Sequence, residues 1–335
     1  MKWQTALGLS FIPSFTLALH LVVQPLSLHN DTRRINLHSS CHNQARGGFF
    51  SEFNNLIANL IYYEKEGIHS VFVDWTHPLF LYKDAPTDNG WDLYFDPVYT
   101  DPINTGSRIK VGYTIQNHEL HDHHCSCIWT RYDNYLPFRL FVHEKIKKHI
   151  RIKKHVLDQV MAFYQDHLAG FPCIGVQVRY AKKHEREAPF GHPSLESYKN
   201  AIDNLLLKCG DTAKIYLATD SQEVVTEFTK EYGSRLIFLD TYRAEGSLDH
   251  NQAALASKED YHRLKAGYRG GLGALMDCLI LAKCDYFIHI TSNLAKTVSF
   301  FNPYIRSMFL PQDAPYVPCR HYGSTHIRNP FINPF

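Results

Sequence analysis

The sequence predicts a two-domain α/β protein, with parallel sheets covered by helices on both faces and a cleft between the domains. Continuous apolar runs alternate with amphipathic segments, a pattern typical of parallel strands that are connected by helices. The chain has 335 residues, enough for more than one core, and its 44% hydrophobic and 20% charged residues indicate a globular protein. Its formal net charge of +2 gives no overall reason to expect nucleic acid as a partner.

Residues 1–30 are set apart from the predicted domains. The stretch 3–23 has no charged side chain and follows Lys2, as in a signal peptide or signal anchor. A buried strand or a frayed extension explains the same residues equally well. A signal segment would place the chain in the Golgi or secretory lumen, or anchor it in a membrane through residues 3–23. Without one we expect a cytoplasmic protein.

The first half of the chain predicts a β-strand, a helix and a second β-strand in succession. "RINLHSS" (34–40) is a strand, "FFSEFNNLIANLIYYEKEG" (49–67) a helix and "SVFVDW" (70–75) a strand. Such a βαβ unit places Gly47 and Gly48 at the carboxyl edge of its first strand. Long loops around short elements are expected over 76–136, and one long helix over 137–167.

The second half shows the same alternation more sharply. Strands are predicted at 173–179, 213–220, 235–240 and 285–291, and helices at 193–210, 221–233, 270–284 and 292–302. Ligands of open parallel sheets bind at the carboxyl ends of the strands. Polar residues follow the apolar runs at those ends: Arg179, Asp220, Asp240 and the Thr291-Ser292-Asn293 step.

These strand ends predict a diphosphate site. The guanidinium of Arg179 can form two parallel hydrogen bonds with phosphate oxygens and is always charged. The helix starts after "GYRGG" and after "ITSN" are expected to add free backbone N–H groups.

Two charged residues of the loop after Arg179 are candidates for catalysis. Glu187 could deprotonate a hydroxyl acceptor, and Lys183 could orient it or stabilise a departing phosphate. The same loop also fits a set of exposed surface ion pairs, which are common and weak.

Three segments resemble the motifs of the α-1,6-fucosyltransferase and nodulation-fucosyltransferase superfamily. They are "GVQVRYAKKHEREAPFGHPSLESY", "IYLATDSQEVVTEFTKEYG" and "RGGLGALMDCLILAKCDYFIHITSNLAKTVSFFNP". The resemblance implies a GT-B fold, with two Rossmann-like domains facing a cleft. Residues 31–160 would form the acceptor-side domain and residues 161–335 the nucleotide-sugar-binding domain. It also implies inverting fucosyl transfer from GDP-fucose to a glycan or glycoconjugate hydroxyl, with no cofactor and no divalent metal.

The resemblance also assigns roles to single positions. Arg179 matches the arginine that binds the diphosphate, Glu187 the proposed catalytic base and Lys183 the lysine beside it. Asp277 matches the aspartate that reads the guanine edge, and Ser292 the serine of the phosphate-contacting loop. The predicted nucleotide-sugar site comprises Gly47, Gly48, Gln177, Arg179, Asp220, Asp277, Thr291, Ser292 and Asn293.

The sequence departs from the family motifs at several positions. Tyr180 replaces a second arginine, Lys182 an aspartate, Ser221 the second aspartate of "ATDD", and Gln177 a histidine. These departures leave a second function open: a catalytically inactive GT-B-like protein that binds a nucleotide sugar or a glycan.

A His/Cys cluster lies outside these motifs. "NHELHDHHCSCIW" (117–129) contains zinc-type ligands, but its C-x-C has no second, distant pair, so a metal site and a polar loop both remain open. "GGLGAL" (270–275) follows a loop rather than a strand, which argues against a dehydrogenase fingerprint.

Overall fold

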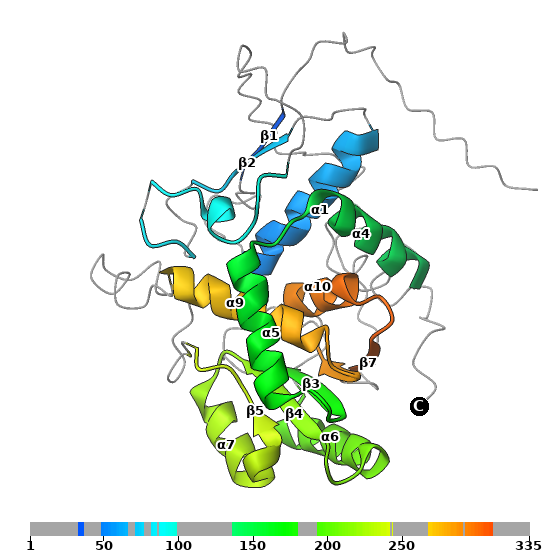
Figure 1. Ribbon diagram of the computed structural model, residues 1–335. Helices are drawn as coiled ribbons and strands as arrows, with labels where there is room; N and C mark the ends of the chain where they lie inside the picture. The colour runs from blue at the N-terminus through cyan, green and yellow to red at the C-terminus, as the bar shows by residue number, and fades with distance from the viewer. Residues whose placement is uncertain are drawn as a thin grey trace, which may run out of the picture. The chain divides into compact units, whose positions relative to one another are not determined.

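The part of the chain that the computed structural model describes contains two parallel β-sheets and the helices around them (Figure 1). It consists of residues 33–36, 48–65, 71–76, 82–85, 87–98, 136–179, 193–241, 243, 267–290 and 292–310. Asp31–Phe335 form one compact unit, so the domain boundary near residue 160 stays a prediction. The segment 3–23 and the His/Cys cluster lie outside the described residues.

The predicted βαβ unit of the first half is confirmed. Strands β1 (Arg33–Asn36) and β2 (Val71–Asp74) pair in parallel, and helix α1 (Phe49–Lys65) connects them. Phe49 packs edge-to-face against Tyr94, with ring centroids 5.1 Å apart. Tyr94 follows the short helix η1 (Gly90–Leu93), one of the short elements expected in the loop region.

The prediction of a single helix over 137–167 is wrong. The chain forms two helices there, α4 (Leu136–His149) and α5 (Lys154–His167). The four residues between them pair with the segment after η1. Phe95 forms an isolated antiparallel bridge with Ile152, and the Lys153 N–H donates to the Tyr94 carbonyl at 3.0 Å. A tertiary pairing therefore interrupts a helical sequence pattern.

The second half forms a five-stranded sheet in the order β5-β4-β3-β6-β7, in which every pair is parallel. The strands are β3 (Cys173–Val178), β4 (Lys214–Thr219), β5 (Leu236–Ile237), β6 (Tyr286–His289) and β7 (Arg306–Phe309). The four predicted strands are confirmed, and β7 was not predicted. All five carboxyl ends meet at one edge of the sheet.

Helices cover both faces of this sheet (Figure 1). They are α6 (Leu195–Cys209), α7 (Gln222–Tyr232) with the short η3 (Gly233–Arg235), α9 (Gly267–Leu281) and α10 (Asn293–Phe301). One hydrophobic cluster joins α6 and α7 to Ile174, Val176 and Leu217. The other joins α5, α9 and α10, together with α1 and α4, to Cys173 and Tyr216 on the opposite face.

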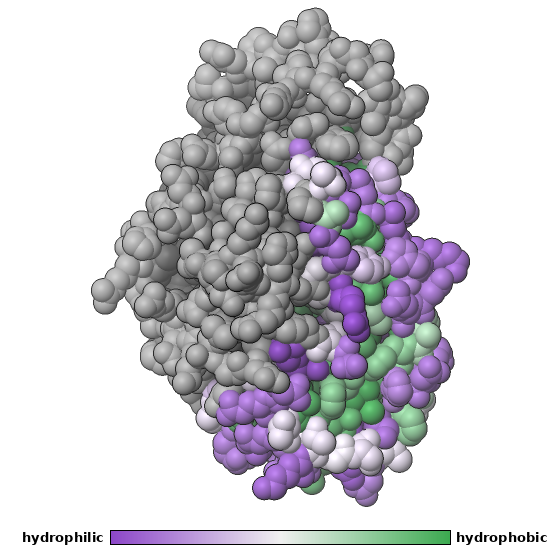
Figure 2. Space-filling model, turned by 90° about the vertical axis from the view of Figure 1, so that its left-hand side faces the viewer, coloured by the Kyte–Doolittle hydropathy of each residue, from purple (hydrophilic) through white to green (hydrophobic). Residues whose placement is uncertain are grey.

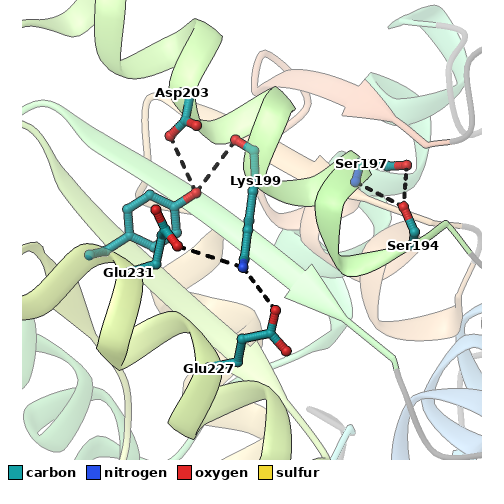
Figure 3. A network of polar contacts seen from close by, with 7 residues as sticks. Ser194, Ser197, Lys199, Asp203, Glu227 and Glu231 are labelled. Atoms are coloured by element: carbon teal, nitrogen blue, oxygen red, sulfur yellow. Dashed lines mark hydrogen bonds and ion pairs between the residues drawn. The ribbon is translucent and has the colours of Figure 1, made fainter.

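Polar contacts fix α6 and α7 to each other (Figure 3). The ammonium group of Lys199 on α6 lies 2.8 Å from Glu227 and 3.6 Å from Glu231, both on α7. The hydrogen bond with Glu227 is the main cause of the raised Lys199 pKa. Ser194 caps α6, since its hydroxyl accepts from the Ser197 N–H at 3.1 Å. These contacts hold α6 and α7 together on this side of the sheet.

The described surface is mixed in polarity. Figure 2 shows hydrophilic residues over much of the described part of one face, with hydrophobic residues gathered between them. In the basic stretch of α4 and α5, Lys147 and Lys154 are exposed and pair with Glu144 and Asp158. Within the described residues, none of the helices combines the length and the apolar character needed to cross a bilayer.

Gly175 in β3 lies close against the end of α9 and the residues that follow it. A Cβ at this position would lie 2.8 Å from Leu281 Cδ2 and 3.2 Å from the Cys284 sulfur. The neighbouring Cys173 and Cys284 sulfurs are buried and only 3.0 Å apart, so the surroundings have little room to yield.

We therefore expect Gly175→Ala to lower the free energy of unfolding by about 1–3 kcal/mol through overpacking. Urea denaturation of the purified protein measures this. Gly48→Ala is the matched control, because its added Cβ would make only an ordinary 3.8 Å contact with the Tyr82 hydroxyl. Equal stability of Gly175→Ala and wild type would contradict the tight packing.

Candidate functional site

The carboxyl edge of the five-stranded sheet brings Arg179 and Asp220 next to each other. Val178 and Thr219 are register partners on β3 and β4, and the two candidate residues follow them directly. Their proximity is also visible in their opposite electrostatic effects on Tyr198 of α6. A guanidinium beside a carboxylate at this edge can position a diphosphate and the sugar or ribose hydroxyls attached to it.

Tyr198 contributes a polar group that the sequence did not indicate. Its side chain is 1% exposed, and its hydroxyl has no hydrogen-bond partner among the described residues. Burial is the main cause of its raised pKa, Asp220 raises that pKa further and Arg179 lowers it. A buried phenol left unpaired is unfavourable, so a ligand at this edge that hydrogen-bonds to it would gain affinity.

Gln177 and Ser292 connect β3 to the start of α10. The Ser292 hydroxyl donates to the Gln177 amide oxygen at 2.7 Å and accepts from the Ala295 N–H at 3.0 Å. Both side chains are buried. The Ser292 hydroxyl thus caps α10 and has no proton left to donate to a phosphate. A phosphate at this edge would instead meet the backbone N–H groups at the start of α10.

Asn293 ties the same edge to the first half of the chain. Its carbonyl accepts from the Asn54 amide of α1 at 3.1 Å and from the Thr297 hydroxyl at 2.8 Å. Gly48 precedes α1, is exposed, and its carbonyl accepts from the Ser51 N–H at 2.9 Å.

The expectation of free N–H groups at both helix starts is wrong for α9. The Tyr268 N–H donates to the Asp84 carboxylate at 2.9 Å, so a side chain of the first half already occupies this helix end. Gly267, with a positive φ of 54°, fits against that carboxylate because a Cβ there would collide with it. The negative charge of Asp84 also opposes an approaching phosphate.

Asp277 lies apart from the strand edge, on the face of the sheet that α9 covers. It accepts a hydrogen bond of 2.6 Å from the Tyr216 hydroxyl of β4. Burial raises its pKa to about 7, while the Tyr216 hydrogen bond and the charge of Arg243 act in the opposite direction. A carboxylate in surroundings poor in water can accept strong hydrogen bonds. It therefore suits recognition of a nucleobase that carries two neighbouring N–H donors.

The structure thus sorts the predicted site into two groups. Gln177, Arg179, Asp220, Ser292 and Asn293 gather at the carboxyl edge, and Asp277 lies on the covered face. Outside the described residues lie Gly47, Lys183, Glu187 and Thr291. Within the described part of the chain, no group of His, Cys, Asp and Glu side chains could hold a metal ion.

Comparison with known proteins places this geometry in a family. The family profile described as Nodulation protein Z (NodZ) matches residues 125–321. Nodulation protein Z of Sinorhizobium fredii is 25% identical over 178 residues, which are 51% of this chain and 50% of the relative. The chain therefore matches only about half the length of this relative.

Solved structures show the fold. The crystal structure of NodZ α-1,6-fucosyltransferase soaked with GDP-fucose has a TM-score of 0.52 at 17% identity, covering 82% of this chain and 94% of that one. A crystal structure of fucosyltransferase NodZ from Bradyrhizobium has a TM-score of 0.49 at 17% identity, and it also covers 82% of this chain and 94% of that one. The first likeness confirms the predicted α/β fold of GT-B type. Because the family profile matches more than half of the residues of this chain, the chain belongs to the NodZ family.

Proposed function

We propose that this chain is a glycosyltransferase that moves fucose from GDP-fucose to a hydroxyl of a glycan or glycoconjugate. The observation that carries the proposal is the meeting of Arg179, Asp220 and the unpaired Tyr198 hydroxyl at the carboxyl edge of a parallel sheet. Membership of the NodZ family and the GDP-fucose soaked into a fucosyltransferase of the same fold support the choice of donor.

In the proposed reaction the acceptor hydroxyl attacks the anomeric carbon of fucose as the bond to the β-phosphate breaks, which inverts the configuration. Arg179 stabilises the negative charge that grows on the departing GDP. Glu187, which the family resemblance assigns as base, takes the acceptor proton, and Lys183 assists at the diphosphate. Side-chain cations thereby replace a divalent metal in neutralising the leaving group.

Metal independence makes a direct prediction. We expect transfer from GDP-fucose to keep its rate when EDTA is added, because Arg179 and Lys183 supply the positive charge. Release of GDP, followed with and without EDTA and then with added Mg²⁺ or Mn²⁺, measures this. A rate that falls with EDTA and returns with the metal would contradict the metal-free mechanism.

An inactive binding protein is the second candidate, suggested by the departures from the family motifs. One of these departures, Ser221 in place of an aspartate, is a weaker argument for inactivity in the structure. The Ser221 hydroxyl caps α7 by accepting from the Val224 N–H at 3.4 Å, and an aspartate can fill the same role. If wild type binds GDP-fucose but releases GDP no faster than Arg179→Ala and Glu187→Ala, the binding function is the correct one.

A further inference from the structure

Arg243 lies in an unusual setting just beyond β5. Its guanidinium nitrogens donate to the backbone carbonyls of Leu239 and Thr241, the latter at 3.3 Å. The guanidinium carbon lies 5.2 Å from the ring centroid of Phe238. Local chain contacts therefore hold the side chain in one orientation.

The same segment packs against the part of α9 that carries Asp277. A Cβ on Gly273 would approach the Thr241 side chain to 2.6 Å, so the loop and the helix touch there. Asp277 follows Gly273 by four residues and shares its face of the helix. Arg243 is close enough that each of the two charges favours the ionised form of the other.

One nitrogen of the Arg243 guanidinium has no hydrogen-bond partner among the described residues. Its Nε–H is buried and has no acceptor among the described residues, although both ends of the guanidinium fork are engaged. An acceptor that enters beside Asp277 would satisfy this donor. Asp277 itself keeps accepting capacity, because Tyr216 uses one lone pair of one carboxylate oxygen.

The edge of guanine fits this pair of groups. It presents two N–H donors, N1–H and N2–H, beside one acceptor, the carbonyl oxygen O6. Resting on the proposed function, and on the resemblance that assigns Asp277 to the N1–H and N2–H donors, we propose that Arg243 is the specificity residue for O6, to which its Nε–H donates. Adenine carries an amino group at position 6 and an acceptor at N1, so both contacts would become repulsive.

The first test uses the wild-type chain and isothermal titration with GDP and 6-thio-GDP. The thio analogue keeps N1–H and N2–H but replaces O6 by sulfur, a weak acceptor. We expect it to bind about tenfold more weakly than GDP, the loss of one good hydrogen bond. Equal affinities would overturn the assignment of Arg243 without touching that of Asp277.

The second test compares Arg243→Met with wild type, because methionine keeps most of the bulk and removes the donor. We expect Arg243→Met to bind GDP and 6-thio-GDP with similar, weak affinities. The ratio of its GDP affinity to its 6-thio-GDP affinity should therefore fall to about one. Since Arg243 also holds its own loop, the ratio rather than the absolute affinity is the readout. A ratio that stays as in wild type would overturn the proposal.

Inosine diphosphate, which lacks the 2-amino group, is the control ligand. Its affinity relative to GDP depends on Asp277 and should be the same in Arg243→Met and wild type when both are measured well above the Asp277 pKa, where the carboxylate is ionised. If GDP gives no heat and no thermal stabilisation in wild type, the proposed function fails. If GDP binds and only the O6 effect is missing, this inference fails alone.

Discussion

Replacing Arg179 by alanine is expected to lower the turnover of GDP-fucose at least about a hundredfold. Charge stabilisation at a leaving group is worth about 3–4 kcal/mol per well-placed donor, which corresponds to a factor of about 100–1,000 in rate. The loss should appear mainly in kcat, because the charge on the diphosphate grows as the bond to fucose breaks. Single-turnover release of GDP measures it directly.

Two further variants make this test specific. Arg179→Lys keeps the charge but loses the fork, so it should recover only part of the rate. Arg235→Ala is the matched control: this arginine is half-buried, pairs with the exposed Asp211 at 3.4 Å and lies at the opposite end of β4 and β5. A similar rate in Arg179→Ala and Arg235→Ala would remove Arg179 from the proposed mechanism.

The second large effect concerns Asp277 and depends on pH. Only the ionised carboxylate can accept both guanine donors, and in the free protein its pKa is raised to about 7 by burial. GDP affinity should therefore be highest above pH 7 and fall by up to about tenfold per unit as the pH drops below it. Isothermal titration of GDP between pH 5.5 and 8.5 (about three units) measures this dependence.

The variant Asp277→Asn separates this effect from general acid sensitivity. An amide accepts at one atom only, so the variant should lose about a hundredfold in GDP affinity, lose little for UDP and show no slope with pH. Equal losses for GDP and UDP would contradict guanine recognition by Asp277.

Folding gives a second measure of the same group, with a definite sign. Because the pKa of Asp277 is raised in the folded state, its neutral form contributes stability that is complete below about pH 4 and lost as the pH rises through about 7. Wild type should therefore lose up to about 4 kcal/mol relative to Asp277→Asn across this range. Urea denaturation at about pH 4.5 and about pH 8, which span most of this range, compares the two.

The elements of the second half could be predicted because each signal is local. Ser194 and Ser221 precede their helices as caps, and uninterrupted apolar runs mark β3 and β4. The break between α4 and α5 could not be predicted, since it depends on pairing with Phe95, some 57 residues earlier in the chain. Helical periodicity carries no information about such a partner.

The same distinction applies to the candidate site. Arg179 and Asp220 follow apolar strands directly, so their positions could be read from the sequence. Tyr198, Tyr216 and Arg243 could not, because an unpaired hydroxyl or N–H is defined by the neighbours that topology supplies. For the same reason the Asp84 carboxylate at the start of α9 was missed: the hydrogen bond spans 184 residues.

The contact between α1 and α10 has a mechanical consequence. Asn54 accepts from the Thr297 hydroxyl at 2.9 Å and donates to the Asn293 carbonyl, and both Asn54 and Thr297 are buried. Pulling these helices apart would leave the buried Asn54 amide without these two partners, at a cost of about 1 kcal/mol or more for each bond. Thr297 would keep the Asn293 carbonyl as its acceptor. We therefore expect α1 and α10 to stay in contact during any hinge movement between the βαβ unit and the five-stranded sheet. The movement would then be a rotation about this contact.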